Sequence, residues 1–101
     1  MAAAAAGLIL AAAPSARAAT VVVTIAQLVF SPKQITARVG DTVVWNNADF
    51  IAHTATGRDH QWDLMIPAHG SARVVLRKPG TIDYFCRFHP NMTGQITVEE
   101  K

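Results

Sequence analysis

Residues 84–94 hold the only cysteine of the chain beside other side chains that bind soft or borderline metal ions. Cys86, His89 and Met92 follow one another at intervals of three. On a tight turn of helical geometry, residues three apart lie about 5–6 Å apart at Cβ, so these side chains are predicted to converge. One thiolate and two imidazoles in a trigonal set, with a weak axial thioether, are the ligands of a blue-copper electron-transfer site. The second imidazole must come from elsewhere in the chain, and His53 is the candidate.

Each of these side chains also has an ordinary structural explanation. Cysteine is often a small buried apolar residue, and histidine can lie in a core with its ring nitrogens hydrogen-bonded. Methionine often fills gaps in a core. An odd cysteine in a secreted chain indicates a free thiol, an intermolecular disulfide or a metal ligand. Because all four residues occur together at this spacing, we favour a single metal site, although zinc could occupy the same ligands. The predicted ligands are His53, Cys86, His89 and Met92.

The first residues of the chain do not resemble part of a folded domain. Residues 2–13 are an apolar run, too short to cross a bilayer as a helix, which takes about 20 residues. Ala16-x-Ala18 then gives the small-x-small pattern of a signal-peptidase site. We therefore predict a signal peptide at residues 1–18 and a single copper-binding domain at residues 19–101, exported to the periplasm. No Lys or Arg precedes the apolar run, although a signal peptide normally begins with a positively charged region. The alternative interpretation of these residues is an Ala-rich helix of the mature fold.

The charge balance excludes some classes of partner. The chain has nine Lys and Arg residues against seven Asp and Glu residues. Nucleic-acid binding needs a basic face built from many Lys or Arg residues, so we expect no nucleic-acid partner. We also expect no membrane span in the mature domain. A domain of this size has a small core, to which a bound metal would add stability.

The rest of the chain has the pattern of short strands separated by turns. Residues 50–56 are predicted to be a short strand or extended segment that carries His53, and the polar residues 57–63, with Trp62 among them, are the longest predicted loop. Seven or eight strands without helical periodicity predict an all-β fold, a β-sandwich with Greek-key connections. Further strands are predicted at 20–25 with 28–30 as its continuation, 34–39, 42–46, 71–76, 81–86 and 95–98, with turns at 40–41, 47–49 and 78–80.

Two motifs give the chain a resemblance to a known family. Trp45-x-Asn47 precedes His53, and the stretch that begins at Pro79 reads P-G-T-x-D-Y-x-C-x-x-H-P-x-M-x-G-x-I-x-V. With these motifs the chain resembles the plastocyanin and amicyanin branch of the cupredoxins, with the short ligand loop of amicyanin. The resemblance implies a cupredoxin-like sandwich with one type 1 copper that cycles between Cu2+ and Cu+. In it, His53, Cys86 and His89 would form the trigonal plane and Met92 would be the axial ligand.

Three positions depart from the pattern of that family. Thr54 stands where an Asn commonly follows the first copper histidine, and a hydroxyl offers one donor where an amide offers two. Ile82 replaces a common tyrosine, and Phe88 replaces a frequent proline. These changes remove no ligand, but Thr54 alters the groups around the sulfur, on which the reduction potential depends. Asn47 matches the Asn that helps to tie the two ligand segments together in the family.

The predicted function is that of a small exported blue-copper protein that carries single electrons and is not an enzyme. A saturated metal site leaves no open position for a substrate. The alternative is a periplasmic copper-binding or copper-delivery protein, whose metal is cargo and whose ligands are exposed and exchangeable. A metal-free, Ig-like adhesion module is a third class. An enzyme such as a nitrite reductase would need further domains and a second copper site.

The expected partners are redox proteins such as a c-type cytochrome or a periplasmic dehydrogenase, and the domain is expected to be a monomer. Electrons are predicted to pass through His89. We expect partners to dock around it, on an apolar surface formed by Phe88 and Pro90 together with Met65 and Ile66.

Other candidate residues have simpler explanations. His60 and His69 lie in predicted loops, where histidines are usually solvated surface groups. Arg87 differs from the other basic residues because it lies inside the ligand stretch.

Overall fold

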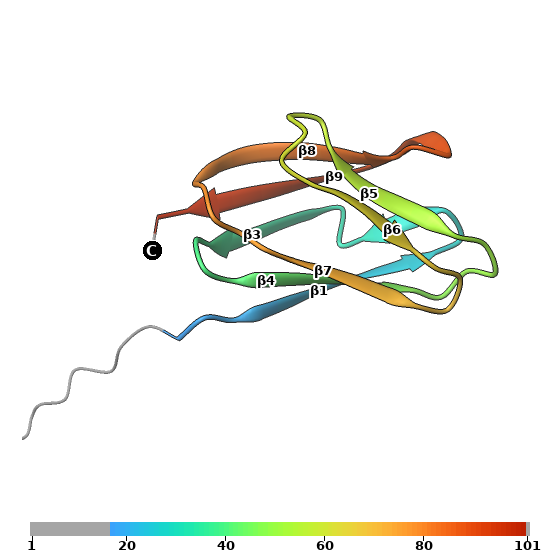
Figure 1. The fold of residues 1–101 in the computed structure, drawn as a ribbon, viewed down its shortest axis with the longest axis horizontal. Coiled ribbons are helices and arrows are strands. Elements are labelled where there is room, and N and C mark those ends of the chain that lie inside the picture. Colours follow the sequence, from blue (N-terminus) through green and yellow to red (C-terminus); the bar gives the residue numbers. More distant parts are fainter. Residues whose placement is uncertain (1–16, 101) are drawn as a thin grey trace, which may run out of the picture.

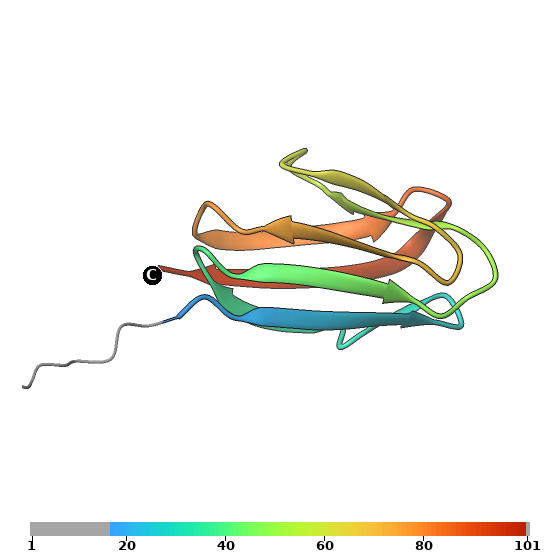
Figure 2. The same cartoon turned by 60° about the horizontal axis from the view of Figure 1, so that its bottom comes forward.

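The computed structural model describes residues 17–100, which form nine strands and no helix. They make two sheets, with strand orders β2-β1-β4-β7 and β3-β9-β8-β5-β6, packed face to face (Figure 1, Figure 2). The predicted β-sandwich is therefore confirmed, with nine strands rather than seven or eight. The strands are β1 (Thr20–Ala26), β2 (Val29–Ser31), β3 (Gln34–Arg38), β4 (Thr42–Asn47), β5 (His53–Gly57), β6 (Asp63–Ile66), β7 (Ser71–Val75), β8 (Gly80–Cys86) and β9 (His89–Glu99).

The connections of the sandwich bring distant segments together. The chain crosses repeatedly from one sheet to the other, so β1 pairs in parallel with β4, and β3 pairs in parallel with β9. In the second sheet β8 lies between β5 and β9. The β1–β2 turn, the loop before β5 and the β8–β9 turn all lie at one end of the sandwich, opposite the C-terminus (Figure 1). This end is where the predicted ligands meet.

The core is built around aromatic side chains from both sheets. Trp45 on β4 and Tyr84 on β8 are 0% and 1% exposed, and Trp45 Nε1 donates a hydrogen bond to the Tyr84 hydroxyl at 3.2 Å. Phe30 and Trp62 contact the Tyr84 ring at centroid distances of 4.7 and 5.5 Å. Edge-on and tilted contacts of this kind add about 0.5–1.5 kcal/mol per pair beyond the buried area. They link the two sheets across the core.

The β1–β2 segment differs from the sequence prediction. Residues 28–30 were expected to continue the first strand, but β2 folds back antiparallel on β1, with Ala26 opposite Val29. Gln27 and Leu28 between them have φ angles of 54° and 64°. Two successive residues with positive φ reverse the chain in a tight hairpin turn.

The ligand stretch also differs from the prediction of a helical turn. Cys86 ends β8, His89 begins β9, and the two residues pair across a hairpin whose turn is Arg87 and Phe88. A register irregularity lies between Phe85 and Cys86. The expected convergence is therefore produced by a β-hairpin, because β9 extends over the whole segment that was expected to be a loop followed by a short strand.

The region after β5 contains more structure than the polar sequence indicated. Residues 63–66 form β6, which pairs with β5, and Trp62 in the predicted loop is only 8% exposed. Ile66 lies opposite His53 and is 0% exposed, so its predicted place in a surface patch is wrong. Met65, which points the other way, is 50% exposed.

The predicted signal peptide falls almost wholly outside the described residues, since these begin at Arg17. Among residues 17–100 there is no helix of the length and apolar character needed to span a membrane.

Candidate metal centre

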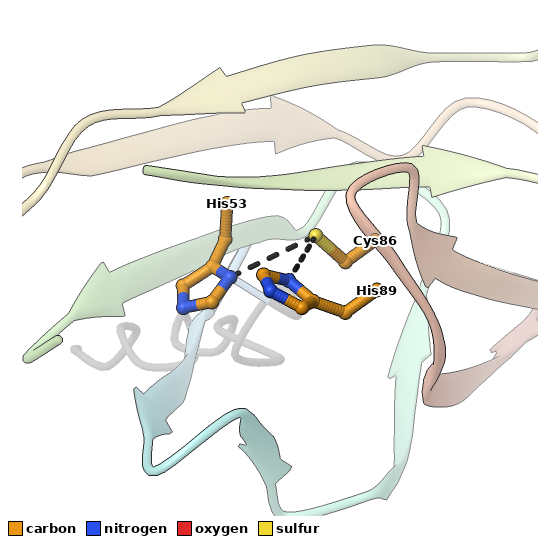
Figure 3. A group of neighbouring side chains, drawn as sticks. All are labelled: His53, Cys86 and His89. Atoms are coloured by element: carbon orange, nitrogen blue, oxygen red, sulfur yellow. Dashed lines mark hydrogen bonds between the residues drawn. The ribbon is translucent and has the colours of Figure 1, made fainter. Parts of the chain in front are cut away.

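Three of the four predicted ligands converge at the end of the sandwich. His53 from β5, Cys86 from β8 and His89 from β9 point toward one another (Figure 3). Cys86 Sγ lies 3.7 Å from His53 Nδ1 and 3.8 Å from His89 Nδ1. The three ligand atoms all lie within 4.8 Å of one another. Because His53 and Cys86 are 0% exposed, the thiol and the first imidazole meet away from water.

These separations fit one small metal ion. Zinc, which is close to copper in size, lies about 2.3 Å from sulfur and about 2.0–2.1 Å from imidazole nitrogen in proteins. At such bond lengths, sulfur–nitrogen separations of 3.7 and 3.8 Å correspond to bond angles of roughly 120°. The fold therefore brings together one sulfur and two nitrogen donors, which are the in-plane donor types of a blue-copper site.

His53 is oriented by a carboxylate. Its Nε2 lies 2.8 Å from Oδ2 of Asp49. A carboxylate only accepts, so Nε2 carries the proton and the lone pair of Nδ1 faces the Cys86 sulfur. Burial opposes the ionisation of Asp49, but hydrogen bonds from the Leu28 and Gln27 amides and from His53 hold the pKa of this carboxyl below its usual value. Carboxylate partners of this kind fix the tautomer and ring angle of metal-binding histidines.

Cys86 is tied to β5 through Thr54. The Thr54 amide N–H donates to Cys86 Sγ at 3.4 Å, and the Thr54 hydroxyl accepts from the Arg87 amide N–H at 2.8 Å. Thr54 therefore joins the two ligand segments with its backbone and its side chain, even though it stands where the family commonly has Asn. Because Thr54 is 0% exposed, both bonds are shielded from competing water.

Asn47 fixes the loop that leads to His53. Its side-chain Nδ2 donates to the carbonyl oxygens of Ile51, Pro67 and Ile66 at 2.9, 3.1 and 3.3 Å. Its Oδ1 accepts the Asp49 amide at 2.9 Å. The expected role of Asn47 is thus met only in part, since it ties the His53 loop to the end of β6 and not to the cysteine hairpin.

Met92 lies on β9, three residues beyond His89, and is 4% exposed. It shares a surface groove with His89, lined by Leu28, Phe88, His89, Pro90, Asn91 and Met92. The His89 side of the site therefore opens toward this groove, whereas the His53 side is closed.

Sequence reasoning overlooked Asp49, which it placed only in a turn. The one local signal was a carboxylate four residues before a predicted ligand histidine. His60 and His69 were expected to be surface residues and are exposed, and among the described residues they are not part of the His53, Cys86 and His89 cluster.

Known proteins resemble the chain in sequence. Residues 1–98 match the family model of the cupredoxin-like domain. The chain belongs to the cupredoxin-like family. This cupredoxin is 33% identical to amicyanin-alpha of Methylorubrum extorquens over 83 residues, which cover 76% of the chain and 70% of that protein. It is 30% identical to amicyanin of Paracoccus versutus over 85 residues, which cover 78% of the chain and 64% of that relative.

Solved amicyanin structures share the fold of this cupredoxin. The crystal structure of amicyanin from Paracoccus versutus superposes with a TM-score of 0.70 at 29% identity, over 79% of this chain and 81% of that one. A mutant amicyanin in its reduced Cu(I) form gives a TM-score of 0.70 at 30% identity, over 79% and 82% of the two chains. The predicted resemblance to the amicyanin branch of the cupredoxins is therefore confirmed.

Proposed function

We propose that this cupredoxin is a small exported blue-copper protein that carries single electrons between larger redox proteins. His53, Cys86, His89 and Met92 would hold one type 1 copper, which would supply the one-electron couple. The observation that carries this proposal is the convergence of one thiol sulfur and two imidazole nitrogens within 4.8 Å in a chain of the cupredoxin-like family.

The residues around the donors suit rapid electron transfer. Bound copper supplies a one-electron couple between Cu(II) and Cu(I), which prefer different geometries. Asp49 and Thr54 hold His53 and Cys86 by hydrogen bonds, so the ligands move little when the charge changes. Four ligands from the chain would leave no open position for a substrate, and the protein is an electron carrier and not an enzyme.

Electrons enter and leave at the groove beside His89. This imidazole is partly exposed, with Phe88 and Pro90 exposed beside it, and Phe88 has 49% of its surface accessible. Other apolar side chains at the same end are exposed to solvent, with exposed fractions of 87% for Phe50 and 44% for Leu28. A partner that covers this surface would exclude water from the shortest path to the metal. The apolar patch consists of Leu28, Phe50, Ile51, Met65, Phe88 and Pro90.

The partners of this patch are redox proteins such as a c-type cytochrome or a periplasmic dehydrogenase. Residues 1–18 are the signal peptide, and residues 19–101 act in the periplasm as a monomeric domain. Recovery of the exported protein with Ala19 as its first residue would support the cleavage site, and recovery of an uncleaved chain would contradict it.

Copper delivery is the competing function. A carrier whose metal is cargo needs ligands that exchange easily, whereas His53 and Cys86 are 0% exposed. If the site is a redox centre, copper will survive dialysis against a moderate chelator and cycle reversibly. Loss of copper in that dialysis would favour delivery.

The decisive experiment is a visible and EPR spectrum after addition of one equivalent of Cu(II), with metal analysis to detect zinc. We expect an intense blue thiolate-to-copper band and narrow copper hyperfine splitting, bleached by ascorbate and restored by ferricyanide. A pale tetragonal spectrum would show that Cys86 is not a ligand.

A further inference from the structure

A chain of hydrogen bonds leads from the ligand hairpin to the protein surface. The Arg87 amide donates to Thr54 Oγ1 at 2.8 Å, and Thr54 Oγ1 lies 3.0 Å from Thr56 Oγ1. The Thr56 hydroxyl donates to Asp63 Oδ1 at 2.8 Å. Arg87 Nε donates to the same Asp63 oxygen at 3.1 Å, so the chain returns to the residue where it began. The closed ring joins β5, β6 and the β8–β9 turn.

The direction of each bond follows from the groups at the two ends. An ionised carboxylate only accepts, so the Thr56 hydroxyl must donate to Asp63. The Thr56 oxygen then accepts the Thr54 hydroxyl proton, and the Thr54 oxygen is left to accept the Arg87 amide. Hydrogen bonds from Thr56 and Arg87 hold the pKa of Asp63 below its usual value. The Asp63 carboxylate is therefore ionised at neutral pH and acts only as an acceptor.

The two threonine hydroxyls are the buried part of the ring, whereas the ion pair is exposed to water. Thr54 and Thr56 are 0% and 5% exposed, so a hydroxyl left without a partner there is destabilising. The Arg87 and Asp63 side chains are 43% and 53% exposed. Exposed ion pairs contribute little, so removing the Arg87 side chain alone should leave the rest of the ring in place.

We propose that Thr56 and Asp63 are positioning residues, which keep the Thr54 oxygen turned toward the Arg87 amide and so hold the hairpin turn that carries Cys86 and His89. Arg87 directly follows Cys86, so anchoring the Arg87 amide limits the directions in which the Cys86 side chain can project from the end of β8. The consequence for copper rests on the proposed function, whereas the anchoring itself exists without metal.

The first test uses the metal-free protein and hydrogen exchange measured by NMR. Thr56→Val removes the hydroxyl without changing charge, and Thr36→Val, at an exposed position of β3, is the matched control. We expect the Arg87 amide of Thr56→Val to exchange about fivefold faster, as loss of a bond worth about 1 kcal/mol predicts. The Arg87 amide should be accelerated more than the core amides of β4, which report any loss of global stability, and Thr56→Ser should restore the rate.

The second test uses the copper-loaded protein. A looser turn would let the oxidised site relax toward the tetragonal geometry that Cu(II) prefers. Thr56→Val should therefore lower the reduction potential and widen the copper hyperfine splitting, while Thr36→Val changes neither quantity. A role in stability alone would leave both quantities unchanged.

Asp63→Ala keeps the test decisive if Thr56→Val fails to fold, because the Asp63 side chain is half exposed. Asp63→Ala should speed hydrogen exchange of the backbone amide of residue 87. Arg87→Ala and Asp59→Ala should not speed the exchange of this amide. Unchanged exchange at residue 87 in Asp63→Ala and in any folded Thr56→Val protein would overturn the proposal. Failure of the unmodified protein to show a blue thiolate band would overturn the copper function but not the anchoring.

Discussion

The Asp49 carboxylate accepts hydrogen bonds from two parts of the molecule, and one of them is Nε2 of His53 at 2.8 Å. The same carboxylate accepts the amides of Gln27 and Leu28 at 2.7 and 3.1 Å. Leu28 belongs to the apolar patch, so Asp49 connects the first predicted copper ligand with the turn that carries part of the docking surface. The Asp49 side chain thus orients the His53 imidazole and also holds the β1–β2 turn beside the site.

Asp49→Asn should weaken copper binding and raise the reduction potential. Carboxylate partners of metal-binding histidines typically contribute about 10- to 100-fold in metal affinity. Loss of the negative charge destabilises Cu(II) more than Cu(I), because Cu(II) carries the larger positive charge. Chelator competition and voltammetry measure the two effects. Asp59→Asn makes the same charge change in an exposed loop, and an equal shift in both variants would contradict a specific role for Asp49.

Met92→Leu should retain copper with a raised reduction potential. Leucine fills a similar volume at this buried position but cannot donate to the metal, and a weaker axial ligand favours Cu(I). Voltammetry together with the visible spectrum checks the prediction. If the variant binds no copper at all, Met92 is not the weak axial ligand.

Phe88→Ala should slow electron transfer without altering the copper spectrum. Phe88 lies in the hairpin turn beside His89 and is 49% exposed, so a partner that docks there would bury it. Aromatic anchors at the centre of an interface commonly contribute more than about 1 kcal/mol, which is about a fivefold loss of binding. The second-order rate constant with a c-type cytochrome is the readout. Val22→Ala, also on an exposed apolar residue but on β1, is the control, and equal rates in the two variants would remove Phe88 from the docking surface.

The strands and the ligand candidates could be predicted because they depend on local pattern. β-Branched runs and turn residues mark most of the strands, and Cys86, His89 and Met92 are close together in sequence. The hairpin geometry could not be predicted in the same way, since spacings of three suit a helical turn as well as a β-hairpin. The choice between them follows from the pairing of β8 with β9, which extends well beyond the ligand stretch.

The remaining features depend on contacts between segments far apart in sequence. The β1–β2 turn is held by Asp49, more than twenty residues away, so Gln27 and Leu28 carry no local signal of a reversal. Trp62 appears as one aromatic residue in a polar run, and its burial follows from packing against Trp45 at 5.4 Å. The ring through Thr54, Thr56 and Asp63 likewise exists only once β5, β6 and the ligand hairpin are assembled.

Tyr84 should limit the stability of the fold at high pH. Burial raises the pKa of Tyr84 to about 12, despite a hydrogen bond from Trp45 that acts in the opposite direction. In the unfolded chain the phenol ionises near pH 10, so the unfolded state gives up its proton first as the pH rises. The resulting stability is fully present below about pH 10 and is lost progressively up to about pH 12, by roughly 3 kcal/mol.

The titration can be measured cleanly because Tyr84 is the only tyrosine in the chain. Ultraviolet absorbance of tyrosinate reports its ionisation directly, and denaturant unfolding at pH 8, 10 and 12 reports the free energy. Tyr84→Phe is the control, since it keeps the ring but cannot ionise, and its stability should fall less over the same pH range. An ionisation midpoint near 10 in the folded protein would contradict the prediction, because it would mean that the hydroxyl is not sequestered beside Trp45.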